Sequence, residues 1–410
     1  MDGRQSTERP GQQRESAAVT RRDFLRRSVV GLAAAGLASA GLAAPPRGGG
    51  GKQGFTAAVA NDAGTGMPYI GIPACQIRVS RIIMGPAAEA VQSRMIQYGA
   101  NYFHKVDACG SKQFMSKLDW DYFFCDVVID KVERDQVLQE FERRRSRVGL
   151  DVVHFFKIHG TLKKPEDLES HDGLFEAFER LRDQGKTRWL AISLHAGAEM
   201  LDACVESGRF QQIQIMFNPA NASQELRAAI AKAQQRGIAI TAMKTMMGGP
   251  RKWQNNARAK QALQQYWPQG ASPAQAVVRW VLAQPGITMV VPRCANTQQA
   301  DENCTAAGAQ LQAWEEEGVQ ALAAALSDTY CRSCRTCEAH CPEGLPVADL
   351  LRYRMYAADY GDTDGARRLY ASLPASARAD RCTDCGLCEE TCPHGVAVRE
   401  LMAEARRVLA

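Results

Sequence analysis

Residues 151–193 read DVVHFFKIHGTLKKPEDLESHDGLFEAFERLRDQGKTRWLAIS, and this stretch decides the fold class. Residues 151–159 and 188–193 are short apolar runs rich in β-formers, and residues 173–184 between them have the spacing of an amphipathic helix. A strand, a helix and a second strand in this order predict a βαβ unit with parallel strands.

The same alternation extends outward from residue 75 to about residue 326. Further strands are predicted at residues 81–85, 101–105, 122–128, 211–218, 239–245 and 287–293, and further helices at residues 135–148, 224–236 and 273–282. Eight strands separated by helices over about 250 residues predict an α/β fold, a (β/α)8 TIM barrel at residues 75–327. A doubly wound sheet is the alternative, but no Gly-rich dinucleotide turn follows the first strand.

Polar residues stand where the predicted strands end, which is where barrels build their sites. They are His104, Lys105, Cys109, Cys125, Asp126, His159, Ser193, His195, Asn218, Lys244, Arg293 and Cys294. Histidines, lysines and cysteines meeting at one mouth predict a titratable pocket, and a metal ion held by His104, Cys109, Cys125 and His159 is one option.

Six segments in this region resemble the aldo/keto reductase superfamily in order and spacing. They are RVSRIIMG (78–85), GANYF (99–103), IHG (158–160), LAIS (190–193), AMK (242–244), and residues 291–303, which begin VPRC. The resemblance implies a barrel that reduces carbonyls by hydride transfer from a nicotinamide, with an Asp-Tyr-Lys-His tetrad in which Tyr donates the proton.

The tetrad is altered in this chain. His159 matches the family His, whereas His104 stands at the Asp position, Cys109 at the Tyr position, and the Lys position falls near Cys125-Asp126. The candidate catalytic residues are therefore His159, His104, Lys105, Cys109 and Asp126. By the resemblance, a tightly bound NAD(P) would be held by Ser193, Asn218, Lys244, Arg293 and Asn303, although Cys294 and Gln299 replace the usual Ser and Arg.

Eight of the 14 cysteines lie in the C-terminal region, residues 328–410. The run Cys-x₂-Cys-x₂-Cys-x₃-Cys-Pro occurs there twice, and in two-cluster ferredoxins the fourth Cys of each run ligates the other cluster. By that rule the two [4Fe–4S] ligand sets are Cys331, Cys334, Cys337 and Cys392, and Cys382, Cys385, Cys388 and Cys341. Zinc or disulfides are the alternatives. The region resembles a small, mostly helical two-cluster ferredoxin domain with a long helical segment at residues 347–373.

The N-terminal segment predicts export. Arg21-Arg22 precede an apolar, Ala/Gly-rich run that ends near Ala38-x-Ala40, which resembles a twin-arginine (Tat) signal at residues 1–44. Residues 45–74 are a linker and N-terminal extension. Tat export carries folded proteins, so clusters are assembled before the chain reaches the periplasm or the outer face of the cytoplasmic membrane. An uncleaved signal would instead act as a membrane anchor.

The leading hypothesis is an exported oxidoreductase whose barrel site exchanges electrons with a small-molecule substrate through two [4Fe–4S] clusters. The alternatives are a non-catalytic electron-transfer or docking subunit and a nicotinamide-dependent carbonyl reductase. Expected partners are a redox protein or membrane electron carrier and the Tat machinery. The net charge is +5 and no basic stripe is visible, so no nucleic-acid partner is expected.

Overall fold

The computed structural model describes residues 66–410 of the chain. Seven parallel strands form one sheet in the order β3-β4-β5-β6-β7-β8-β9. They are β3 (Tyr102–Phe103), β4 (Phe124–Ile129), β5 (Val153–His159), β6 (Thr187–Leu194), β7 (Gln212–Met216), β8 (Ala239–Met243) and β9 (Ile287–Val290). The sheet curls into a (β/α)8 barrel-like fold, which confirms the predicted fold class.

The expected first strand, residues 81–85, is reduced to two isolated bridges rather than a regular strand. Ile82 pairs with Val290 of β9 and Met84 pairs with Phe103 of β3, both in parallel. The Ile83 amide donates to the Val290 carbonyl at 2.9 Å, and the Met84 amide donates to the Tyr102 carbonyl at 2.8 Å. This segment therefore spans the gap between the two edge strands.

A hairpin that was not predicted as such precedes the barrel. Strands β1 (Tyr69–Ile72) and β2 (Ile77–Ser80) pair antiparallel around a 3-10 turn, η1 (Pro73–Cys75). Ile72, Cys75 and Val79 pack with residues near the starts of the barrel strands, among them Phe124 and Phe155. The hairpin thus covers the amino end of the barrel, opposite the end where the polar residues gather.

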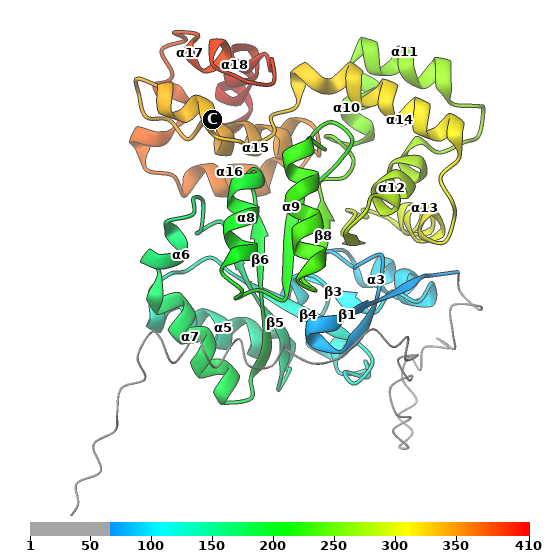
Figure 1. The fold of residues 1–410 in the computed structure, drawn as a ribbon, viewed down its shortest axis with the longest axis vertical. Coiled ribbons are helices and arrows are strands. Elements are labelled where there is room, and N and C mark those ends of the chain that lie inside the picture. Colours follow the sequence, from blue (N-terminus) through cyan, green and yellow to red (C-terminus); the bar gives the residue numbers. More distant parts are fainter. Residues whose placement is uncertain (1–65) are drawn as a thin grey trace, which may run out of the picture. The chain divides into compact units, whose positions relative to one another are not determined.

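Helices cover the outside of the barrel (Figure 1). The longer ones are α3 (Glu89–Gln97), α5 (Arg134–Val148), α7 (Asp172–Asp183), α8 (Ala198–Glu206), α9 (Gln224–Gln235), α11 (Ala257–Tyr266), α12 (Pro273–Ala283), α13 (Thr297–Ala307) and α14 (Ala313–Leu326), and the shorter ones are α4 (Lys112–Met115), α6 (Asp167–Ser170) and α10 (Pro250–Asn255). Their ends follow local chemistry: Ser272 caps α12 ahead of Pro273, and Gly149 ends α5 with a left-handed φ of 72°.

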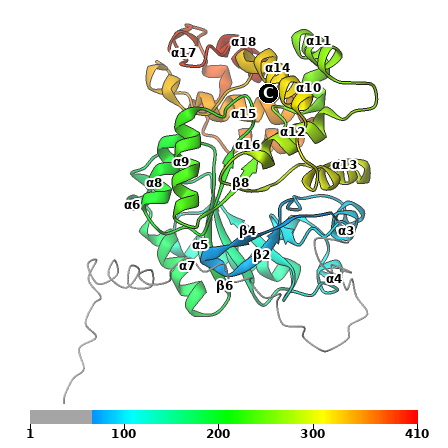
Figure 2. The same cartoon turned by 45° about the vertical axis from the view of Figure 1, so that its right-hand side comes forward.

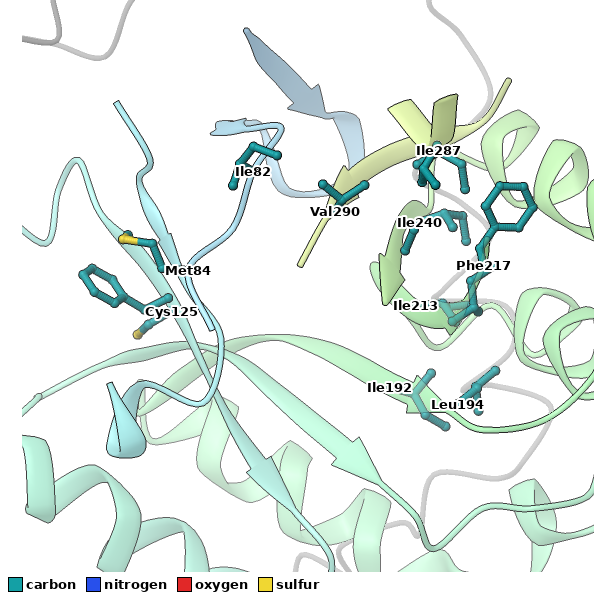
Figure 3. Close-up of a cluster of buried hydrophobic side chains, with 14 of the residues drawn as sticks. Ile82, Met84, Cys125, Ile192, Leu194, Ile213, Phe217, Ile240, Ile287 and Val290 are labelled. Atoms are coloured by element: carbon teal, nitrogen blue, oxygen red, sulfur yellow. The ribbon is translucent and has the colours of Figure 1, made fainter. Parts of the chain in front are cut away.

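Side chains alternate across the barrel wall. Figure 3 shows Met84, Cys125, Ile192 and Ile240 within one buried apolar cluster, which packs the strands against their helices. The residues between them along each strand belong to the opposite face and point into the barrel. The strand period of two therefore decides which polar residues enter the site.

The C-terminal region is helical and has its own apolar core. Its helices are α15 (Val347–Ala358), α16 (Thr363–Ala371), α17 (Leu387–Glu390) and α18 (Val398–Leu409), joined by 3-10 turns that include η3 (Ser327–Thr329) and η4 (Thr336–His340). The predicted long helical segment is confirmed as α15 and α16. Figures 1 and 2 both show these two helices beside the upper ends of α8 and α9.

The predicted Tat signal and most of the predicted linker lie outside the described residues. Among residues 66–410, no helix combines the length and the apolar character that crossing a bilayer requires.

Candidate active site

A buried ion pair lies inside the barrel below the mouth. The Lys157 ammonium donates to Asp126 Oδ2 at 2.6 Å, and both side chains are fully buried. His104 Nδ1 lies 3.0 Å from each Asp126 oxygen. Burial alone would raise the pKa of Asp126, but His104 and the Lys157 ammonium hold it well below its usual range. Asp126 is therefore an ionised carboxylate that positions His104 and Lys157.

Lys157 was not singled out in the sequence, where the family Lys position falls near Cys125-Asp126. It comes from β5 rather than β4, two residues before His159. Because strand side chains alternate, Lys157 and His159 share the inward face. A carboxylate and a lysine are therefore both present inside the barrel, Asp126 on β4 and Lys157 on the neighbouring strand β5.

The barrel cysteines do not reach a common metal site. Cys109 is buried, and its thiol donates to the backbone carbonyls of His104 and Lys105 at 3.1 and 3.3 Å. Cys125 faces the helices and lies 3.5 Å from His154 Nδ1. Burial raises the pKa of both thiols. The Cys109 thiol is therefore poorly placed to give a proton to a substrate, and within residues 66–410 the expected ligands His104, Cys109, Cys125 and His159 do not converge on a single metal ion.

The mouth itself holds two histidines and two lysines. His159 and His195 meet edge to face with ring centroids 5.1 Å apart, and Lys244 Nζ lies 3.0 Å from His195 Nε2. Burial, followed by the nearby cations, lowers the pKa of both histidines well below the usual value, so both are neutral at pH 7. Among the described residues, His159 Nδ1 is buried and has no hydrogen-bond partner.

Lys105 and Lys244 both have left-handed backbone at the ends of their strands, with φ of 54° and 55°. Such conformations cost about 1–3 kcal/mol in residues with a side chain and are found mainly at functional sites. The Lys105 amide donates to Asp126 Oδ1 at 2.9 Å, while its ammonium has no partner within the described part of the chain. The left-handed turn at Lys105 thus leaves the Lys105 ammonium available at the mouth of the barrel.

The C-terminal region reaches the mouth with three side chains that sequence reasoning missed. Asn218 donates to Tyr330 Oη at 2.9 Å, and Lys244 donates to Tyr356 Oη at 2.7 Å. Arg352, one turn before Tyr356 on α15, lies 3.5 Å from the same oxygen. Tyr330 belongs to the barrel's apolar core and not to that of the C-terminal region. These three residues follow the barrel segment in the sequence, so a search for polar residues at the ends of barrel strands could not find them.

The residues expected to hold NAD(P) are engaged elsewhere. Asn218 and Lys244 bind Tyr330 and Tyr356, and Arg293 pairs with Asp362 at 3.7 Å. Asn303 is buried and donates to Cys294 Sγ at 3.3 Å, while Ser193 Oγ lies 3.8 Å from Met243 Sδ. Three of these five contacts lead to the C-terminal region, so a nicotinamide nucleotide bound at these residues would have to displace them.

The structure gathers the eight C-terminal cysteines into the two predicted sets. Cys331, Cys334, Cys337 and Cys392 line one small cavity. Cys341, Cys382, Cys385 and Cys388 line another. Amides donate to sulfur in both sets, from Ser333 to Cys331 and from Leu345 to Cys341, each at 3.4 Å. All-thiolate sets with amide donors fit [4Fe–4S] clusters.

The first cysteine set lies against the barrel. Ser333 Oγ is 3.8 Å from Met216 Sδ at the end of β7, and Cys331 follows Tyr330 directly. Met216 also lines a neighbouring pocket together with Cys331 and Ser333, whereas the cavity of the second set is lined by residues of the C-terminal region. The first set is therefore the one next to the barrel mouth.

In the two ligand sets, the fourth cysteine of each sequence run joins the first three cysteines of the other run. This arrangement predicts which cysteine variants lose the same cluster. We expect Cys392→Ser to disturb the same cluster as Cys331→Ser, and to leave the cluster of Cys382 spectroscopically intact, because Cys392 lies in the cavity of Cys331. Iron counting with electron paramagnetic resonance of the reduced protein checks this. Cys204→Ser, in the barrel core, is the control and should keep the full iron content. A Cys392→Ser spectrum that matches Cys382→Ser would refute the pairing.

Comparison with known proteins agrees with this geometry. The sequence profile of the aldo/keto reductase family matches residues 125–324, and that of the 4Fe-4S dicluster domain matches residues 330–397. Residues 125–324 are therefore similar to an aldo/keto reductase domain, and residues 330–397, the dicluster domain, are similar to a 4Fe–4S dicluster domain.

Individual relatives are distant. An aldo-keto reductase of Mycolicibacterium smegmatis is 29% identical over 171 residues, which cover 41% of this chain and 57% of the relative. The chain therefore spans little more than half the length of that curated relative. An aldo-keto reductase from Bacillus halodurans superposes with a TM-score of 0.52 in its holo form and 0.51 in its apo form, at 15% and 16% identity. Each match covers 62% of this chain and 96% of the other, and shows the fold alone.

Proposed function

We propose that this protein is an iron–sulfur oxidoreductase whose barrel site exchanges electrons with a small-molecule substrate by way of the dicluster domain. One observation carries the proposal: Tyr330 and Tyr356 of the dicluster domain bind Asn218 and Lys244, the strand-end residues that the family resemblance assigns to the cofactor. In this arrangement, tyrosines of the dicluster domain contact two of the five residues that the resemblance assigns to a nicotinamide nucleotide.

The bound clusters would supply single electrons. Cys331, Cys334, Cys337 and Cys392 would hold the cluster beside the barrel, and the other four cysteines would hold the outer one. The barrel's own residues would bind and orient the substrate: His159 offers an unpartnered Nδ1, and Lys105 offers an unpartnered ammonium. Two cations and two neutral histidines favour a substrate oxygen that becomes negative on reduction.

An anaerobic turnover assay tests the proposal. Holoprotein is mixed with reduced methyl viologen as the one-electron donor, and with an aliphatic aldehyde, an aromatic ketone or an ortho-quinone as the acceptor. We expect viologen oxidation that depends on the acceptor, and no turnover with NADPH in place of viologen. Turnover with NADPH that leaves the clusters oxidised would contradict the proposal.

A non-catalytic docking subunit is the second candidate. The loss of the barrel Tyr favours it, because the family acid is replaced by a buried thiol. Under that function no acceptor in the panel would be reduced, although the clusters would still accept electrons from viologen. The same assay therefore separates the two candidates.

We propose in addition that the chain is exported by the Tat pathway and acts in the periplasm or on the outer face of the cytoplasmic membrane, with a redox protein or membrane carrier as partner. Cys385 is exposed on the outer cysteine set, where such a carrier would approach. We expect the double change Arg21→Lys and Arg22→Lys to retain the protein in the cytoplasm, as measured by cell fractionation. Periplasmic recovery equal to that of the natural sequence would contradict Tat export.

A further inference from the structure

The dicluster domain presents one helix face to the barrel mouth. Arg352 and Tyr356 stand four residues apart on α15 and therefore share a face. Arg352 is anchored from behind by Asp349, with a 2.7 Å hydrogen bond between Arg352 and Asp349 Oδ1. Its guanidinium carbon also lies 5.8 Å from the centre of the Tyr356 ring. The face of α15 toward the barrel therefore carries the Tyr356 phenol, with the Arg352 guanidinium of the same helix beside it.

The Tyr356 hydroxyl lies among groups contributed by both domains. Lys244 donates to Tyr356 Oη at 2.7 Å, and Arg352 lies 3.5 Å from it. His195 Nε2 is 3.5 Å from the same oxygen and 3.0 Å from Lys244 Nζ. Two cations and a neutral imidazole therefore surround one phenol oxygen, which is the environment that stabilises a phenolate.

The other titratable groups at the mouth are poor proton donors. His159 and His195 are neutral imidazoles, Lys157 is tied to Asp126, and the Cys109 thiol donates to backbone carbonyls below the mouth. Burial would raise the pKa of Tyr356, but Lys244 and Arg352 outweigh it and lower this pKa to about 7. Among these groups, Tyr356 is the one that exchanges its proton near neutral pH.

We propose that Tyr356, on a helix of the dicluster domain, is the proton donor of the barrel site and replaces the tyrosine that the barrel lacks. The proposal rests on the function proposed above and deepens it. It means that the site is complete only when the dicluster domain is docked on the barrel, so that one domain supplies both the electrons and the proton.

The chemistry balances for a carbonyl or quinone oxygen. Reduction to the alcohol or hydroquinone takes up two electrons and two protons, and the electrons come from an external one-electron donor. As charge builds on the substrate oxygen, the O–H bond of Tyr356 breaks and a new O–H bond forms on the substrate. The Tyr356 phenolate regains its proton from the Lys244 ammonium, which is reprotonated from water, and water supplies the second proton.

Two measurements on the holoprotein test the proposal. The first needs no substrate: ultraviolet difference absorbance of tyrosinate is followed against pH, with Tyr356→Phe subtracted from the natural sequence. We expect one tyrosine to ionise near pH 7. Lys244→Met should move this ionisation to higher pH, because it removes the closest cation. Ionisation of Tyr356 at its ordinary value near pH 10 would overturn the proposal.

The second measurement is the viologen assay as a function of pH. Reduction needs the protonated phenol, so the rate should fall as pH rises through about 7. Tyr356→Phe should lower the rate by about 10²–10⁴-fold and abolish that limb, while Lys244→Met should shift the limb upward. Tyr370→Phe is the matched control and should leave rate and profile unchanged, because the Tyr370 hydroxyl lies on α16 and accepts from the Ala379 amide at 3.0 Å.

Failure of this proposal is distinguishable from failure of the proposed function. A protein that reduces no acceptor but shows the low tyrosine ionisation contradicts the function and keeps the assignment of Tyr356 as an acidic phenol. A protein that reduces an acceptor equally well with Phe at position 356 keeps the function and overturns the proton donor.

Discussion

The change Asp126→Asn is expected to destabilise the barrel by about 3–5 kcal/mol, because it leaves the buried Lys157 ammonium without its carboxylate. The urea midpoint of the anaerobic holoprotein, followed by circular dichroism, measures this loss. Replacing both partners at once, with Asp126→Leu and Lys157→Met, should cost much less, since no buried charge remains unpaired.

Asp130→Asn provides the control on the same βα segment. Asp130 pairs with Lys131 at 3.9 Å, both half exposed, and such a pair contributes at most about 1 kcal/mol. If Asp126→Asn changes the midpoint no more than Asp130→Asn, then the pair inside the barrel is not the ion pair described above.

The change His159→Ala should lower acceptor-dependent viologen oxidation by about 10²–10³-fold, the usual effect of removing one polar group that contacts the reacting oxygen. His159 stands at the mouth with Nδ1 unpartnered in the described chain, so its loss leaves no protein group unsatisfied. Cluster content and the urea midpoint should stay unchanged. The comparison therefore isolates chemistry from folding.

His171→Ala is the matched control, because His171 Nδ1 binds the Asp167 carbonyl at 2.9 Å in the turn between α6 and α7. It should keep the natural rate. Equal rates for His159→Ala and the natural sequence would favour a docking role for the barrel. His104→Ala is less informative, because His104 is bound to the buried Asp126 and its loss affects stability as well.

The barrel could be predicted from the sequence because its signals are local. Each strand is an apolar run and each helix has its own period, as in residues 151–193, and the cysteine runs have a spacing that few other sites share. The first strand was overestimated, since Ile82 and Met84 make isolated bridges where the barrel closes. The strand-end rule also found His104, Asp126, His159 and Lys244.

The sequence alone does not show which residue contacts each strand-end residue. Lys157 was recoverable in principle, because it is two residues before His159 and faces the same way. Tyr330, Arg352 and Tyr356 were not, because they reach the barrel through docking of a second domain. That docking also engages two residues that match the family's cofactor pattern: Asn218 and Lys244 bind tyrosines of the dicluster domain.

The central claim is that electrons reach the barrel site from the dicluster domain without a nicotinamide. Its most direct test is a cofactor count on protein purified anaerobically from a host that assembles the clusters. The protein is denatured, released small molecules are identified by mass spectrometry, and iron and sulfide are measured on the same sample. We predict about eight irons per chain and no nicotinamide. A stoichiometric nicotinamide beside those irons would contradict the account.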